Sequence, residues 1–105
     1  MKVIVVRPGY DPVVEKIEDT LEAMQTIVGG YIEAVYPFED YVALLCNEES
    51  KLNGMPPNRC LFNDDGDVLD IIFGTFFLCG APADAEDFTS IPDDLIEKYI
   101  KKFSY

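Results

Sequence analysis

Apolar residues occur in short blocks along this chain, and the spacing within each block predicts a strand or a helix. Residues 2–7 are rich in valine and isoleucine, which is typical of a β-strand, and Pro8-Gly9 ends the block. Residues 31–36 alternate polar and apolar positions and predict a strand with one face in water. Residues 41–46 are apolar almost throughout, which favours a strand at the centre of a sheet.

Two segments show helical spacing instead. Residues 19–28 place apolar side chains on one face, with Asp19 as the expected N-cap and Gly29-Gly30 as the stop. A second helix is expected from about Ile91, with Ser90 as its cap. The apolar residues of this second helix recur every four positions and should pack on the sheet: Ile91, Leu95, Tyr99 and Phe103.

The remaining apolar blocks are less regular. Residues 13–18 fit either a short strand or the lead into the first helix. Residues 63–67 predict a tight hairpin turn with Asp65-Gly66 at its positive-φ positions. Residues 68–79 are rich in β-forming residues, but Gly74 interrupts them and predicts a bulge or a close backbone contact.

The order of these elements predicts the fold class. Adjacent strands outnumber helices, which favours an α+β fold with a mostly antiparallel sheet of about four to five strands. We expect two helices packed on one face of that sheet. The 105 residues are enough for one hydrophobic core, so residues 1–105 are expected to form a single domain.

Composition excludes several kinds of function. The chain has 20 acidic and 8 basic residues, a net charge of −12, so it should repel nucleic-acid duplexes and anionic membranes. It contains no histidine, which removes Ser-His and Cys-His catalysis and the commonest zinc ligand. We therefore expect no catalytic residues, no metal and no cofactor.

The lengths of the apolar stretches and the spacing of the cysteines favour an intracellular protein. No apolar stretch is long enough for a signal peptide or a membrane span, so a cytoplasmic location in a bacterial host cell is expected. Cys46, Cys60 and Cys79 are odd in number and form no C-x-x-C motif. They are expected to be buried, reduced thiols.

The negative charge is concentrated in one part of the sequence. Residues 61–90 contain seven acidic residues and no basic residue. One interpretation is a solvated acidic face, and another is a surface that docks on a basic partner. A metal site is less favoured because the spacing does not match a calcium-binding loop. The candidate partner-binding residues are Asp64, Asp65, Asp67, Asp84, Glu86 and Asp87.

Residues 47–59 form the longest irregular stretch, because Pro56-Pro57 opposes a regular helix or a central strand, and a strand resumes at residues 60–62. A guanidinium held here would suit a phosphate or carboxylate. The candidate ligand-binding residues are Arg7, Asn47, Glu48, Lys51, Asn58 and Arg59. The alternative is a purely structural loop in which Arg59 pairs with Glu48 or Glu49 and the asparagine side chains bond to the backbone.

Three sequence runs carry a family resemblance: TLEAMQTIVGGYIEAV, CNEESKLNGMPPNR and DIIFGTFFLCG. In this order they resemble domain-of-unknown-function family 3846, and the resemblance covers nearly the whole chain. The resemblance implies a setting in phages, conjugative elements and other mobile DNA of bacteria. It implies no particular activity.

These observations lead to three functional hypotheses. The first is a non-enzymatic counter-defence protein that inhibits a bacterial immune system, of anti-CRISPR or anti-restriction type, by binding a defence protein through its acidic surface. The second is an oligomeric sponge that sequesters a small anionic signalling nucleotide near residues 47–59. The third is a small enzyme or regulator of nucleotide metabolism. A homo-oligomer is expected for the nucleotide sponge.

Overall fold

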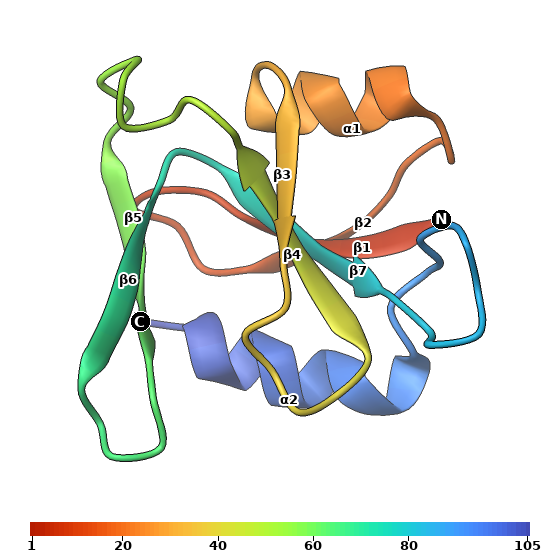
Figure 1. The fold of residues 1–105 in the computed structure, drawn as a ribbon. Coiled ribbons are helices and arrows are strands. Elements are labelled where there is room, and N and C mark those ends of the chain that lie inside the picture. Colours follow the sequence, from red (N-terminus) through yellow and green to blue (C-terminus); the bar gives the residue numbers. More distant parts are fainter.

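The computed structural model describes residues 1–105 as three layers, with a β-sheet between two helices and a separate two-stranded hairpin at one side (Figure 1). The elements in chain order are β1 (Lys2–Val6), β2 (Val13–Lys16), α1 (Leu21–Val28), β3 (Ile32–Val35), β4 (Val42–Asn47), β5 (Pro57–Phe62), β6 (Val68–Phe73), β7 (Phe76–Gly80) and α2 (Asp93–Phe103). The α+β class and the antiparallel sheet are confirmed.

The main sheet has five strands in the order β2-β1-β7-β4-β3, all antiparallel. Its three inner strands β1, β7 and β4 are buried over nearly their whole length. The apolar run at residues 41–46 is therefore an inner strand, as predicted. Residues 13–18 contain the edge strand β2 and not a lead into the helix.

The two helices lie on opposite faces of the sheet, and the prediction that both pack on one face was wrong (Figure 1). Val3 and Val5 of β1 pack with α1, whereas Ile4 and Val6 pack with α2. The physical reason is that the inner strands are apolar at odd and even positions alike, so both faces must be covered. Each helix has only one apolar stripe and can cover only one face.

The hairpin β5–β6 completes the core on the α2 side. Leu61 and Ile72 point into the same cluster as Tyr99 and Phe103 of α2. The strand that was expected to resume at Cys60 begins earlier, at Pro57, which is tolerated because it is the first residue of a two-stranded ribbon.

Gly74 separates β6 from β7, so the run at residues 68–79 that it was expected to interrupt forms two strands. Its φ is +76°, and a Cβ there would lie 2.7 Å from the sulfur of Met55. Its N–H donates to the Pro56 carbonyl at 2.7 Å. The predicted close contact is confirmed, and it joins the 47–56 loop to the turn between the two strands.

The turns and caps differ in detail from the expected ones. In the hairpin turn only Gly66 has a positive φ, and Asn63 Oδ1 accepts from the backbone N–H groups of Asp65 and Asp67. Thr20, not Asp19, caps α1, because its hydroxyl accepts from the Ala23 N–H at 3.1 Å.

The second helix also begins later than the sequence suggested. Its cap position is Pro92, which offers no side-chain acceptor, and Ser90 Oγ instead accepts from the Lys2 N–H at 2.8 Å. The predicted four-residue stripe does pack on the sheet, with Ile91, Tyr99 and Phe103 almost fully buried. Neither helix is long and apolar enough to cross a lipid bilayer.

Candidate functional site

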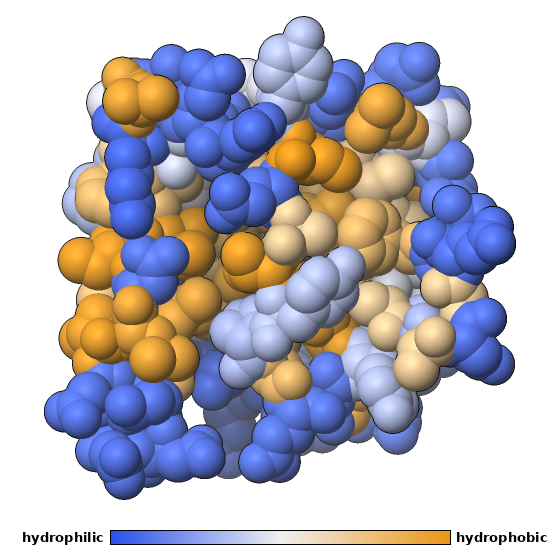
Figure 2. All heavy atoms as spheres, viewed as in Figure 1, coloured by the Kyte–Doolittle hydropathy of each residue, from blue (hydrophilic) through white to orange (hydrophobic).

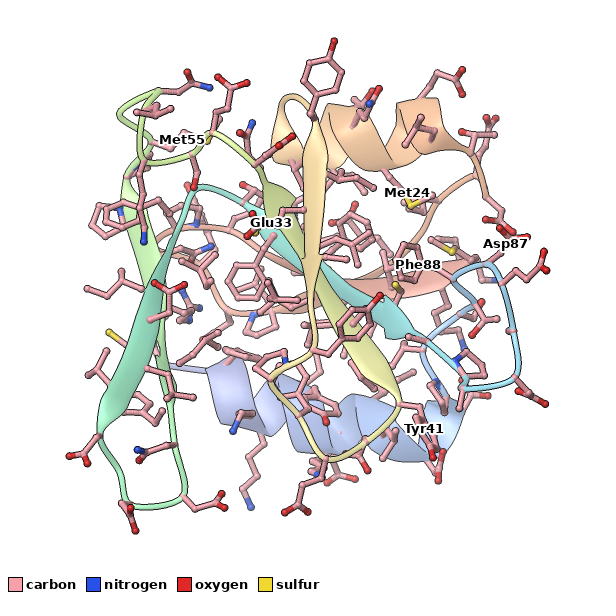
Figure 3. The ribbon with its side chains drawn as sticks, in the orientation of Figure 1. Met24, Glu33, Tyr41, Met55, Asp87 and Phe88 are labelled. Carbon is pink, nitrogen blue, oxygen red and sulfur yellow. The ribbon has the colours of Figure 1, made fainter.

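The loop after β4 borders a surface depression of about 200 Å³. Its walls come from β3, the end of β4, the 47–52 loop and β6, with Glu33 on the side of β3 that faces the hairpin (Figure 3). Of the predicted ligand-binding residues, Asn47, Glu48 and Lys51 line this depression. Arg7, Asn58 and Arg59 do not, so the six residues do not form one pocket.

Arg59 is occupied by contacts within the protein. Its Nε donates to the Phe103 carbonyl at 2.9 Å, and its Nη2 donates to the Tyr10 carbonyl at 2.7 Å. Its Nη1 donates to Asn58 Oδ1 at 2.7 Å and to Tyr105 Oη at 2.8 Å. The guanidinium therefore holds the hairpin, the 8–11 loop and the end of α2 together, and it pairs with neither Glu48 nor Glu49.

The two asparagines of the loop are also structural. Asn47 is 4% exposed, and its amide donates to the Val28 carbonyl at 3.1 Å while its Oδ1 accepts from the Glu49 N–H at 2.7 Å. The Asn58 amide donates to the carbonyls of Val6 and Gly74 at 2.9 and 2.8 Å. Both side chains join separate strands or loops through buried backbone groups.

The charge around the depression is mainly negative. Four carboxylates line it, from Glu33, Glu48, Glu49 and Asp70. The only cation among its lining residues is Lys51, whose Nζ lies 3.2 Å from Asp70 Oδ1. The remaining predicted cation, Arg7, pairs with Glu15 at 2.7 Å. Arg7 and Arg59 therefore lie outside the depression that Lys51 lines, and all three cations already have partners within the protein.

Cys46 lines the same depression, and its side chain is largely buried. Burial, with smaller contributions from Glu33 and Asp70, raises the pKa of its thiol to about 11. Burial also raises the pKa of Cys79 to about 12. Both thiols are buried, as predicted, but Cys60, which pairs with Ile71 across the hairpin, is exposed.

The predicted acidic residues fall into two separate groups. Asp64, Asp65 and Asp67 are at the tip of the β5–β6 hairpin, whereas Asp84, Glu86 and Asp87 are in the loop after β7 on the other side of the molecule (Figure 1). Glu86 and Asp87 lie near Met24 and Phe88, beside α1 (Figure 3). One flat partner cannot cover both groups, so the single acidic surface expected from the sequence divides into two.

The exposed apolar face of the hairpin was not expected. Its exposed fractions are 57% for Phe62, 55% for Val68, 59% for Leu69 and 39% for Ile71. Phe62 pairs with Val68 across the hairpin, and Cys60 pairs with Ile71. Figure 2 shows apolar residues gathered over this side of the molecule. The sequence signal was present, but a strongly apolar segment such as residues 68–73 also fits a buried strand.

Comparison with known proteins agrees with the resemblance noted in the sequence. Neither the curated proteins nor the solved structures give a match to this chain. A family model matches residues 1–104, which include every strand and helix of the fold. The chain therefore belongs to the family described as Domain of unknown function (DUF3846).

Proposed function

We propose that this protein acts by binding another protein, without catalysis, through the exposed apolar side chains of the β5–β6 hairpin. The observation that carries the proposal is the row of exposed apolar side chains at Phe62, Val68, Leu69 and Ile71. A small monomeric protein seldom exposes several large apolar residues side by side unless they contact a partner.

The charge around that face indicates what kind of partner fits. Asp64, Asp65 and Asp67 lie at the hairpin tip, and Asp70 lies on β6. The sequence contains no basic residue between Arg59 and Lys98. The complementary surface is therefore apolar at its centre and basic at its rim, as in a protein that itself binds nucleic acid.

The mobile-element setting that the family resemblance implies points to a class of partner. A bacterial defence protein that handles nucleic acid has the basic surface that this hairpin fits. We therefore propose inhibition of such a protein in the bacterial cytoplasm as the biological role. The acidic hairpin would compete with nucleic acid for the basic surface and would be attracted to it at long range.

The proposal is tested by changing the apolar face without changing its charge. The tagged protein is used to capture partners from bacterial cells, and the affinity of each purified partner is then measured. We expect the double variant Leu69→Gln and Ile71→Gln to bind its partner at least about tenfold more weakly, because such exposed apolar anchors supply much of the binding energy.

The matched control is the double variant Val13→Gln and Val14→Gln. These two side chains are exposed by 48% and 39% on the edge strand β2, so the control removes similar apolar area elsewhere. Partner affinity should be unchanged in the control. Equal affinity of the hairpin variant and the unaltered protein would contradict the proposal.

A further inference from the structure

We infer that the groove between β3 and β6 receives an extended, lysine- or arginine-containing segment of the partner, which pairs with the free edge of β3. This inference rests on the proposed function, because it assumes that the bound partner is a basic protein. It adds the site of insertion and the conformation of the inserted segment.

The groove consists of two depressions that follow the same two elements. The first, of about 200 Å³, lies between Glu33 of β3 and residues 70–72 of β6. The second, of about 310 Å³, lies between Tyr36, which follows β3, and Leu69 of β6 together with the hairpin turn. As β3 proceeds from Glu33 toward Tyr36, β6 proceeds backward from Ile72 to Leu69. The two depressions share no lining residue, but they lie one after the other along β3 and are together called the channel.

The outer edge of β3 has backbone groups available for pairing. This strand is last in the sheet and pairs only with β4. The Glu48 N–H donates to the Tyr31 carbonyl at 2.9 Å, so Tyr31 is a hydrogen-bonded position of the β3–β4 pair, and so are Glu33 and Val35. Since hydrogen-bonded residues alternate along an antiparallel pair, the N–H and C=O groups of Ile32 and Ala34 face away from β4. An added strand would bond to these groups.

The side chains beside that edge favour a basic segment. Glu33 and Val35 share the face of β3 that looks toward α2 and the hairpin, because Val35 packs in that cluster and alternate residues share a face. Every second side chain of an added strand would enter the channel. The channel is lined by one ammonium, of Lys51, and six carboxylates, of Glu33, Glu39, Glu48, Glu49, Asp64 and Asp70.

The same charges disfavour the other possible occupants. A nucleotide would bring its phosphates against these carboxylates. A second copy of the chain has a net charge of −12, so edge-to-edge pairing of two copies would be opposed by repulsion. An exposed charged residue such as Glu33 also protects a free sheet edge against nonspecific pairing with strands of other proteins. The edge is thus open chiefly to a strand that carries positive charge.

The probe for this inference is a synthetic nine-residue peptide in which lysine alternates with valine. Its binding to the full chain is followed by NMR measurement of backbone amide exchange. At a peptide concentration ten times its Kd, the amides of Ile32 and Ala34 should exchange about tenfold more slowly. The same peptide with glutamate in place of lysine should leave both amides unchanged.

A pair of proline variants tests the backbone contact directly. Ala34→Pro removes an edge N–H that makes no bond to β4. Val14→Pro makes the matched change on the opposite edge, because Met1 and Ile17 exchange hydrogen bonds and the Val14 N–H therefore faces outward. Ala34→Pro should weaken the lysine peptide at least about tenfold, and Val14→Pro should not. Both variants must retain the circular dichroism spectrum of the unaltered protein.

Three results would overturn the inference. The first is unchanged amide exchange at Ile32 and Ala34 when the lysine peptide is added. The second is equal peptide affinity of the Ala34→Pro variant and the unaltered protein. The third is amide protection that rises with protein concentration alone, which would indicate pairing with a second copy. Failure of the proposed function is distinguishable. If partner binding depends on Leu69 and Ile71 but not on the β3 edge, the proposed function stands and only this inference fails.

Discussion

The guanidinium of Arg59 lies 4.1 Å above the ring of Tyr105 and donates to its hydroxyl at 2.8 Å. The same hydroxyl accepts from the Gly9 N–H at 2.9 Å. This pair connects the hairpin to the segment after α2 and to the loop after β1. Arg59 is therefore a structural residue, although the sequence presented it as a candidate anion ligand.

Replacing Arg59 should destabilise the protein. The variant Arg59→Ala loses the bonds to Phe103, Tyr10 and Tyr105 and leaves carbonyls without donors. We expect the free energy of unfolding to fall by about 2–3 kcal/mol, as hydrogen bonds from a charged donor are among the stronger ones. Urea denaturation followed by circular dichroism measures it. The control Arg7→Ala breaks only one half-exposed ion pair and should cost less than about 1 kcal/mol. Similar small losses in both variants would contradict the structural role.

Gly74 should tolerate no side chain. In Gly74→Ala the alanine backbone would have to keep a positive φ, and its methyl group would meet the sulfur of Met55. Gly66→Ala is the matched control, because its φ is +84° but nothing lies within 4 Å of the new Cβ. We expect a loss of about 1 kcal/mol in Gly66→Ala from backbone strain alone, and a clearly larger loss in Gly74→Ala. Equal losses, measured by urea denaturation, would show that the contact with Met55 is not tight.

The thiols should differ in reactivity. Cys46 and Cys79 are buried with pKa values raised to about 11 and about 12, whereas Cys60 is exposed on the hairpin. A thiol reagent at neutral pH should label Cys60 alone in the folded protein, and all three after unfolding. Mass spectrometry locates the label. Binding of a partner to the hairpin face should slow the labelling, since Cys60 pairs with Ile71 there. Rapid labelling of Cys46 in the folded protein would contradict the described packing.

Asp40 should contribute to stability in a pH-dependent way. Hydrogen bonds from Lys98 and then from Tyr99, at 2.6 and 2.7 Å, hold the pKa of Asp40 below its ordinary value of 3.8. The unfolded state then binds more protons in acid than the folded state does. The contribution is therefore present above about pH 4 and is lost as the pH falls through the folded pKa. The difference in urea midpoint between the unaltered protein and Asp40→Asn should shrink on acidification. A constant difference would contradict the pairing.

Much of the fold was accessible from the sequence because local pattern and tertiary environment agree. The valine-rich β1, the apolar β4 and the four-residue stripe ending at Phe103 each have one stable location in an α+β protein. The placement of the helices was not accessible in the same way. Neither face of the inner strands is polar, so a helix must cover each face. This follows only once those strands are known to lie side by side in one sheet.

The candidate site was harder to predict, because residue type does not show whether a side chain already makes hydrogen bonds or packing contacts within the protein. Arg59 and Asn58 have the chemistry of ligands, but backbone carbonyls distant in sequence occupy their donors. Leu69 and Ile71 have the chemistry of core residues, but the break at Gly74 turns β6 away from the main sheet. In both cases long-range geometry, absent from local sequence, decides the role.

The most direct test of the account compares charge reversal in the two acidic groups. One triple variant changes Asp64, Asp65 and Asp67 to lysine, and the other changes Asp84, Glu86 and Asp87 to lysine, so the net charge changes equally in both. The measurement is partner affinity as a function of salt concentration. The account predicts that the hairpin variant binds at least about tenfold more weakly at low salt and loses most of its salt dependence, while the loop variant stays close to the unaltered protein. Equal weakening in both variants, or weakening in the loop variant alone, would contradict it.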